Sequence, residues 1–85
     1  MMTFPKVFIL RMRNVPFIDA TGLNTLREFY LHCKREKTTL ILSSVKKEIS
    51  KELRSYGLEE MIGKEHIFSH IDPALKQASQ LVERS

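Results

Sequence analysis

The sequence has little of what builds a disulfide framework, a secretory leader or a membrane span. Its single cysteine, Cys33, excludes an intramolecular disulfide and favours a reducing compartment. No signal-peptide pattern is present, and no apolar run approaches the roughly 20 residues that a membrane-spanning helix needs. The 85 residues, of which 42% are hydrophobic, therefore predict one domain that is soluble as given.

Charge of one sign is not concentrated anywhere in the chain. The net charge of +4 and the pI near 9.5 would suit a nucleic-acid binder. The 14 Lys and Arg residues, however, are spread along the sequence and mostly interleaved with Glu, as in "KREK" and "KKEISKELR". A nucleic-acid-binding face would show one basic stripe with aromatic residues between the charges, and that stripe is missing. We therefore predict no nucleic-acid partner, whereas weak attraction to anionic lipid surfaces remains compatible with the charge.

Groups that carry chemistry are also few and far apart. The three glycines stand alone, so there is no Gly-rich phosphate-binding loop. His66 and His70 straddle a predicted strand and turn. Only His32 and Cys33 could join them, which is a poor basis for a zinc site. Asp19 follows a strand, as the phosphoacceptor of a receiver domain does, but the earlier acidic cluster for Mg²⁺ is missing. The sequence predicts no catalytic residue, no metal site and no cofactor.

The first half of the chain has the pattern of a strand, a helix and a second strand. "KVFILRM" (Lys6–Met12) and Thr38–Ser44 are continuous apolar runs of strand length, typical of strands buried on both faces. Between them a helix is predicted over Gly22–Glu36. Its apolar residues recur at helical spacing: Leu23, Leu26, Tyr30 and Cys33. A unit of this kind requires parallel strands joined by a right-handed crossover.

The second half predicts two more helices and a short strand. A helix over Lys46–Tyr56 should end at Gly57 in the left-handed conformation. A third strand is predicted at His66–Phe68, and a last helix at Pro73–Glu83 with Asp72 as its N-cap. The inner face of that helix should carry Leu75, Ala78 and Val82. The fold class is therefore α/β, ordered βαβαβα, with a small and mainly parallel sheet flanked by helices.

Three short strands are few for a free-standing sheet of this class. With the first two helices on one face, the other face and at least one sheet edge need a cover. The last helix, a partner chain or further sequence could provide it. We therefore expect the chain to be part of a larger domain and to self-associate through its first strand where that strand is uncovered.

The join between the first strand and the first helix, "FIDATGL", allows two interpretations. In the structural one, Thr21 is the N-cap, Asp19 caps the same turn or bonds locally, and Gly22 allows a sharp turn or close packing. A Thr21→Ala change would then cost about 1 kcal/mol. In the functional one, the hydroxyl lies where partners meet parallel sheets, and its phosphorylation would place an anion at a helix N-terminus. The predicted partner-contact loop comprises Pro16, Phe17, Asp19, Ala20, Thr21, Gly22 and Leu23.

"VPFIDATGL" resembles the signature of STAS domains, the family named for sulfate transporters and anti-sigma factor antagonists. The rest of the chain, "LILSSVKKEISKELRSYGLEEMIGKEHIFSHIDPALKQA", resembles the C-terminal STAS domain of sulfate permease (SulP) transporters. The resemblance covers essentially the whole chain and implies one STAS domain over residues 1–85. STAS domains normally carry further strands before the element that begins at Lys6, so the chain is expected to be the C-terminal part of the domain.

The transporter resemblance implies a non-catalytic regulatory and interaction module of a SulP-type sulfate or related anion transporter. The module would lie on the cytoplasmic side of the membrane as part of an integral membrane protein. Its partners would be the membrane domain of the same transporter and another cytoplasmic protein. The alternative is a soluble phospho-switch of the anti-sigma factor antagonist type that binds a protein partner. In that branch a partner kinase phosphorylates the hydroxyl residue before the glycine, which here is Thr21.

Overall fold

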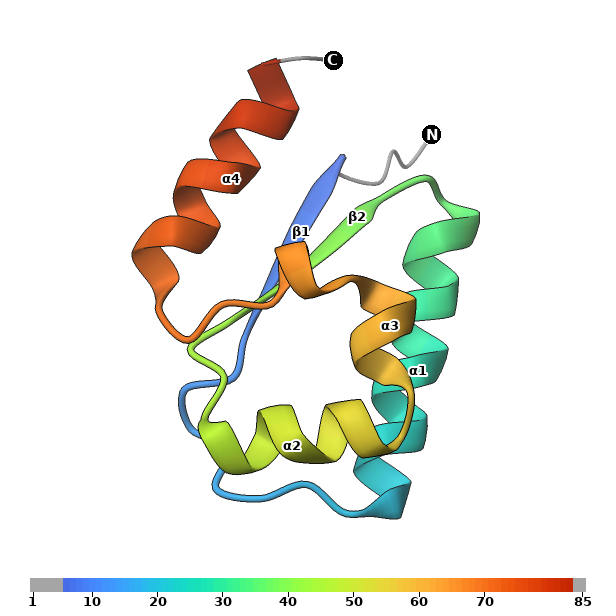
Figure 1. Ribbon diagram of the computed structural model, residues 1–85. Coiled ribbons are helices and arrows are strands. Elements are labelled where there is room, and N and C mark those ends of the chain that lie inside the picture. The colour runs from blue at the N-terminus through green and yellow to red at the C-terminus, as the bar shows by residue number, and fades with distance from the viewer. Residues whose placement is uncertain (1–5, 84–85) are drawn as a thin grey trace.

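The computed structural model describes residues 6–83, and the side chains of residues 6–82 (Figure 1). The elements follow one another as β1 (Val7–Arg11), α1 (Ala20–Arg35), β2 (Thr39–Ser43), α2 (Lys47–Ser55), α3 (Leu58–Ile62), the 3₁₀ helix η1 (Lys64–His66) and α4 (Ile71–Glu83). None of the helices in this part of the chain combines the length and the apolar character that crossing a membrane requires.

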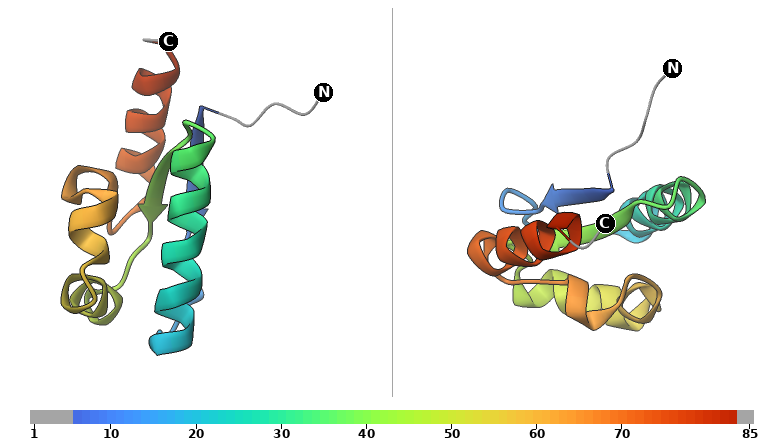
Figure 2. Two further views of the ribbon diagram at one scale, coloured as in Figure 1. Left: turned by 90° about the vertical axis from the view of Figure 1, so that its right-hand side faces the viewer. Right: turned by 90° about the horizontal axis from the view of Figure 1, so that it is seen from above.

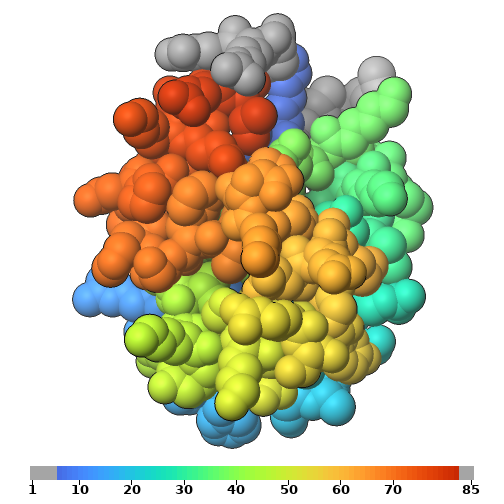
Figure 3. Space-filling model, viewed as in Figure 1, coloured from blue at the N-terminus to red at the C-terminus, as the bar shows by residue number. Residues whose placement is uncertain are grey.

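The two strands pair in parallel, as predicted for the first half of the chain. The register runs from Val7 opposite Thr39 to Arg11 opposite Ser43. α1 and α4 lie on opposite sides of these strands (Figures 1 and 2). The last helix, α4, contacts both strands and covers the face that α1 leaves free, which is one of the covers expected from the sequence. Figure 3 shows the side chains of α2, α3 and α4 closing the face turned to the viewer.

The prediction of a third strand at His66–Phe68 is wrong. Over residues 6–83 the sheet has two strands, and the third segment contributes an isolated parallel bridge between Ile67 and Leu42. The chain enters this segment through Gly63, whose φ of 102° starts a 3₁₀ turn closed by a bond from His66 N–H to Gly63 O. That turn uses the residues that would have extended the strand. The order is therefore βαβ followed by helices.

The two strands differ in burial because only β2 is enclosed. β2 is buried over Leu40–Ser43, as predicted. The prediction that the first strand is buried on both faces is wrong, because β1 lies at the margin of the molecule (Figure 2) and Phe8 is 38% exposed. α1 packs over β2.

The core fills the space between α1, β2, α2 and α3. Its buried apolar members are Met12, Leu23, Leu26, Cys33, Leu40, Leu42, Val45, Ile49, Leu53, Leu58 and Ile62. Gly57 adopts the left-handed conformation with φ 83°, as predicted for the end of the second helix. The short helix α3, which the sequence analysis did not predict, begins immediately after it at Leu58. Leu58 is fully buried, so the first residue of α3 belongs to the core.

The last helix begins earlier and faces a different way than predicted. α4 starts at Ile71, so Asp72 lies in its first turn and is not the residue before the helix. Ala74 is the fully buried residue of its inner face, whereas Leu75 and Val82 are 51% and 55% exposed. Ala78 is half-buried. A small side chain at the buried position is compatible with close packing of α4 against the two strands that it contacts.

Candidate functional site

The join between β1 and α1 is built around a cap made by Asp19. Asp19 has an extended backbone, and its Oδ1 accepts a hydrogen bond from Gly22 N–H at 2.9 Å. Its carbonyl accepts from Leu23 N–H, also at 2.9 Å. The prediction of Thr21 as N-cap is therefore wrong, and the alternative named beside it, a cap by Asp19, is confirmed. The helix begins at Ala20, two residues earlier than predicted.

Thr21 is an exposed residue in the first turn of α1. Its carbonyl oxygen accepts a bond from the Thr25 hydroxyl at 3.0 Å. The side chain of Thr21 is not needed for the cap, and solvent reaches it. A partner or a modifying enzyme could therefore reach this hydroxyl without opening the helix. Its role as phosphoacceptor stays a prediction.

Gly22 is needed because another side chain lies against it. A Cβ at this position would lie 2.9 Å from Cγ1 of Ile18 and 3.4 Å from Oδ1 of Asp19. The first distance is shorter than ordinary van der Waals contact between carbon atoms. The backbone of Gly22 is helical, so close packing explains the glycine and a sharp turn does not.

The predicted contact loop is mostly available at the surface. Its exposed members are Pro16, Phe17, Asp19, Ala20 and Thr21, and Gly22 is half-buried. Phe17 is 73% exposed, a large value for an aromatic residue. Leu23 is different, because it is 5% exposed and belongs to the core. Its side chain is therefore not part of the surface that this loop presents.

Beside the loop lies an open apolar hollow of about 570 Å³, here called the β1–α1 hollow, which the sequence analysis missed. Its walls are Phe8, Leu10, Met12, Val15, Phe17, Ile18, Asp19, Gly22, Thr25, Leu26 and Phe29. Phe8 of β1 meets Phe29 of α1 edge to face, with ring centroids 5.1 Å apart. The available signal was the spacing of two along the first strand, which places Phe8, Leu10 and Met12 on one face.

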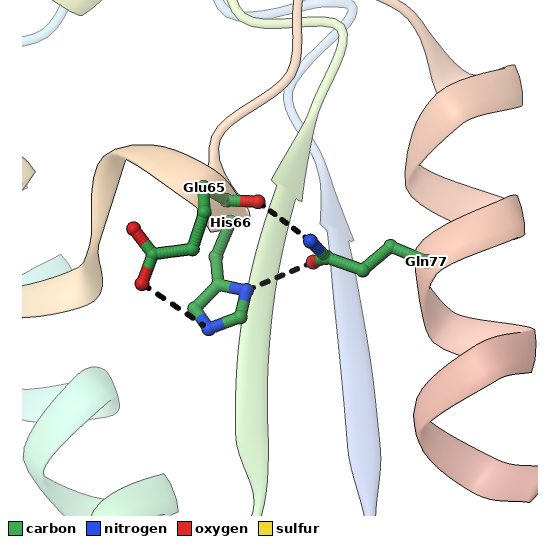
Figure 4. A network of polar contacts seen from close by, with 3 residues as sticks. All are labelled: Glu65, His66 and Gln77. Carbon is green, nitrogen blue, oxygen red and sulfur yellow. Dashed lines mark hydrogen bonds and ion pairs between the residues drawn. The ribbon is translucent and has the colours of Figure 1, made fainter.

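Apart from the β1–α1 join, a polar cluster of three residues joins η1 to α4 (Figure 4). His66 Nδ1 lies 2.8 Å from Gln77 Oε1, and Gln77 Nε2 donates to Glu65 O at 2.7 Å. The other ring nitrogen of His66 lies 3.8 Å from a carboxylate oxygen of Glu65. We call these three residues the α4 clamp. Their contacts cross between elements and position the last helix.

The remaining reactive groups do not form a site among the described residues. Cys33 is buried in the core, as predicted, and desolvation raises the pKa of its thiol. A thiol held in its neutral form is a poor nucleophile. Over residues 6–83 no group of three or more His, Cys, Asp and Glu side chains is arranged to hold a metal ion.

The family comparison agrees with this geometry. The family model described as "STAS domain" matches residues 3–74. Two curated relatives are from Arabidopsis thaliana. "Sulfate transporter 4.1, chloroplastic" is 30% identical over 77 residues, and "Probable sulfate transporter 4.2" is 32% identical over 76 residues. The matches cover 91% and 89% of this chain but 11% of each relative, so the chain spans about a ninth of their length.

Two solved structures share the fold. The crystal structure of a sulfate transporter family protein from Wolinella succinogenes is 51% identical, with a TM-score of 0.91 over 93% of this chain and 65% of that chain. The STAS domain of a SulP transporter from Vibrio cholerae is 26% identical, with a TM-score of 0.94 over 100% of this chain and 66% of that chain. The α/β fold class and the resemblance to SulP STAS domains are thereby confirmed. This chain belongs to the STAS domain family.

Proposed function

We propose that this chain is a non-catalytic regulatory and interaction module of a SulP-type transporter for sulfate or a related anion, on the cytoplasmic side of the membrane. The observation that carries the proposal is the match of about nine-tenths of the chain to proteins named as sulfate transporters. The module would act through the β1–α1 join, where Phe17 and Thr21 are exposed beside an apolar hollow. Its first partner would be the membrane domain of the transporter, and a second cytoplasmic protein could dock on the same loop.

We also propose that residues 1–85 form the C-terminal part of a STAS domain. Two features support this. The chain matches 65% and 66% of the two solved relatives. In addition, one edge of β1 faces no other strand within residues 6–83. A paired partner for that edge would complete the sheet, because an unpaired strand edge is a liability that proteins normally cover.

The test is anion uptake in the organism that encodes this chain. We expect deletion of residues 1–85 to reduce uptake of radiolabelled sulfate or of another anion in a panel of divalent oxyanions and dicarboxylates. The wild-type sequence should restore uptake, and Thr21→Asp should change it. Ser79→Asp, an exposed substitution of equal charge on α4, is the matched control and should behave as wild type. If the deletion leaves the uptake of every anion in the panel unchanged, the transporter assignment is refuted.

The exposed Thr21 favours one alternative function, the protein-binding phospho-switch. A phosphate there would add a charge of about −1.5 to −2 to the surface of the loop. The N-terminus of α1 would favour that charge by about 0.3–1 kcal/mol, whereas the neighbouring Asp19 would oppose it. Folding would therefore change little while the partner surface becomes anionic. Mass spectrometry should find phospho-Thr21 on protein isolated from cells and none after incubation with ATP alone.

A further inference from the structure

A small polar pocket lies at the end of the sheet opposite to the β1–α1 join. Its volume is about 180 Å³, and its walls come from the end of α1, the start of β2, α3 and η1 (Figure 1). It reaches Thr39, the first residue of β2, which pairs with Val7 at the start of β1. No residue of β1 lines this α1–η1 pocket, so its walls do not depend on what covers the outer edge of β1.

The α1–η1 pocket is lined by side chains that donate hydrogen bonds. Lys34 and Tyr30, one helical turn apart on α1, bring an ammonium group and a hydroxyl. Thr39 brings a second hydroxyl from β2, and His66 brings an imidazole ring from η1. Within residues 6–83 the side chains of Tyr30, Lys34 and Thr39 take part in no hydrogen bond or ion pair. These three groups are therefore available to a ligand.

The proton on His66 is placed by its contact with Gln77. Gln77 Nε2 donates to Glu65 O, so the oxygen of the same amide faces His66 Nδ1 at 2.8 Å. An amide oxygen only accepts, and Nδ1 therefore carries a hydrogen. In the neutral ring Nε2, which lies on the side away from Gln77 (Figure 4), is then only an acceptor. His66 can donate to a ligand through Nε2 only when the ring is protonated.

Positive charge is in excess around the pocket. The charged residues at the end of α1, in the turn after it and at the start of η1 are the cations Lys34, Arg35, Lys37 and Lys64 and the acids Glu36 and Glu65. All six are exposed. A pocket that offers donors inside a positively charged surface favours an anion over a cation or a neutral ligand.

Two features oppose an anion, and neither is strong. The carboxylate of Glu65 lies 3.8 Å from His66 Nε2, but this side chain is 70% exposed, and an exposed contact of this length contributes little. The C-terminal end of α1 carries partial negative charge on its carbonyl groups. Those of His32, Cys33 and Lys34 already accept hydrogen bonds from the turn that follows. A ligand anion can therefore take the place of the Glu65 carboxylate beside Nε2.

We propose that the α1–η1 pocket binds a doubly charged tetrahedral oxyanion, and that His66 takes up a proton when the anion binds. The anion is free sulfate or phosphate, or the terminal phosphate of a small molecule. Lys34 supplies a permanent positive charge, the hydroxyls of Tyr30 and Thr39 donate to the oxygens, and protonated His66 donates through Nε2. A pocket of this volume has room for several water molecules, and hence for an anion of this size. The inference does not rest on the transport function proposed above.

The coupling to a proton follows from the groups that surround the ring. Those that share the pocket or contact the ring are Tyr30, Lys34, Thr39, Ile62, Glu65 and Gln77. Among all these residue types only histidine ordinarily changes its charge between about pH 5 and 8. An anion that binds the protonated ring better must bind more tightly as the pH falls through this range.

The test is an NMR titration of the full ¹⁵N-labelled chain with sodium sulfate, and sodium chloride at equal ionic strength is the comparison. Sulfate keeps its double charge at both pH values used. At about pH 6 we expect sulfate to shift the amide signals of Lys34, Thr39 and His66 along saturable curves, with a dissociation constant of about 1 mM or less. At about pH 8 binding should be weaker by about threefold or more, because the ring is then mostly neutral.

A second series of titrations identifies the source of the anion. Inorganic phosphate and glycerol phosphate are compared with sulfate at about pH 8, where both phosphates carry close to two charges. Tighter binding of the ester identifies the terminal phosphate of a small molecule as the ligand. Tighter binding of sulfate or of inorganic phosphate identifies the free anion.

Variants of the protein make the assignment specific. Lys34→Gln should weaken sulfate binding about tenfold at both pH values, whereas Lys51→Gln, exposed on α2, changes the net charge equally and should have no effect. His66→Asn should bind sulfate equally well at both pH values. His70→Asn, an exposed histidine outside the pocket, should keep the pH dependence of the wild-type protein.

Three outcomes would overturn the proposal. The first is that chloride shifts the same signals as much as sulfate does, or that sulfate shifts none of them in a chain whose spectrum shows it to be folded. The second is wild-type affinity for sulfate in Lys34→Gln. The third is an unchanged pH dependence in His66→Asn, because the proton would then be taken up elsewhere.

Discussion

Replacement of Asp19 tests how the β1–α1 join is built. Asp19→Ala removes the oxygen that accepts the bond from Gly22 N–H and leaves that donor without its cap. Loss of an N-cap of this kind costs about 1 kcal/mol, within a range of roughly 0.5–2 kcal/mol. For a domain of this size, each kcal/mol lowers the melting temperature by about 4–8 °C. We therefore expect Asp19→Ala to melt several degrees below the wild-type protein.

Two matched variants separate the contribution of the Asp19 cap to stability from that of the other residues in the motif. Asp19→Asn keeps a good cap and loses only the charge, so it should retain most of the stability. Thr21→Ala removes an exposed hydroxyl that caps nothing, so the free energy of unfolding should change by less than about 0.5 kcal/mol. Thermal and urea unfolding followed by far-ultraviolet circular dichroism measure all three. A Thr21→Ala protein as unstable as Asp19→Ala would refute the assignment of the cap.

The remaining predictions concern packing, burial and the α4 clamp. Gly22→Ala should destabilise the protein by about 1–3 kcal/mol in urea unfolding, because the added Cβ meets Ile18. In a protein that already carries Ile18→Ala, the same change should cost much less, because the opposing side chain is gone. Because burial raises the pKa of Cys33, its neutral thiol contributes stability that is complete below the ordinary thiol pKa of about 8.5. That contribution is lost as pH rises through the folded-state pKa. The stability difference between wild type and Cys33→Ala, measured by urea unfolding, should therefore narrow towards about pH 10, and a constant difference would contradict this linkage. Gln77→Ala should speed amide hydrogen exchange in α4, and the exposed change Gln80→Ala should not.

The elements that local patterns encode were predicted well. The apolar run at Thr38–Ser44 became the buried strand β2, and the stripe that includes Leu23 and Cys33 became the inner face of α1. Gly57 ends α2 in the left-handed conformation. The strand depends on a continuous apolar run, the helix on a period of 3.6 residues, and the turn on the special backbone freedom of glycine, and all three are properties of neighbouring residues.

The wrong predictions share a different cause. Asp19 and Thr21 are both good caps by residue type, and the backbone path out of β1 decides between them. Leu75 has an apolar side chain at a helical spacing, yet it is 51% exposed, whereas Ala74 is the buried residue of the helix that contacts both strands. Phe8 lies in an apolar run but stays partly exposed because β1 is at the margin of the sheet.

The sequence by itself therefore determined the parallel βαβ unit, the positions of most helices and the family, because periodicity and a short motif carry that information. Only the tertiary structure decided which side of each element is buried and which candidate residue caps α1. It also brought Phe8, Phe17 and Phe29 together around one hollow. The physical reason is distance along the chain. Contacts between residues that are far apart in sequence determine which side chains are buried, and no local pattern specifies which distant residues will make those contacts.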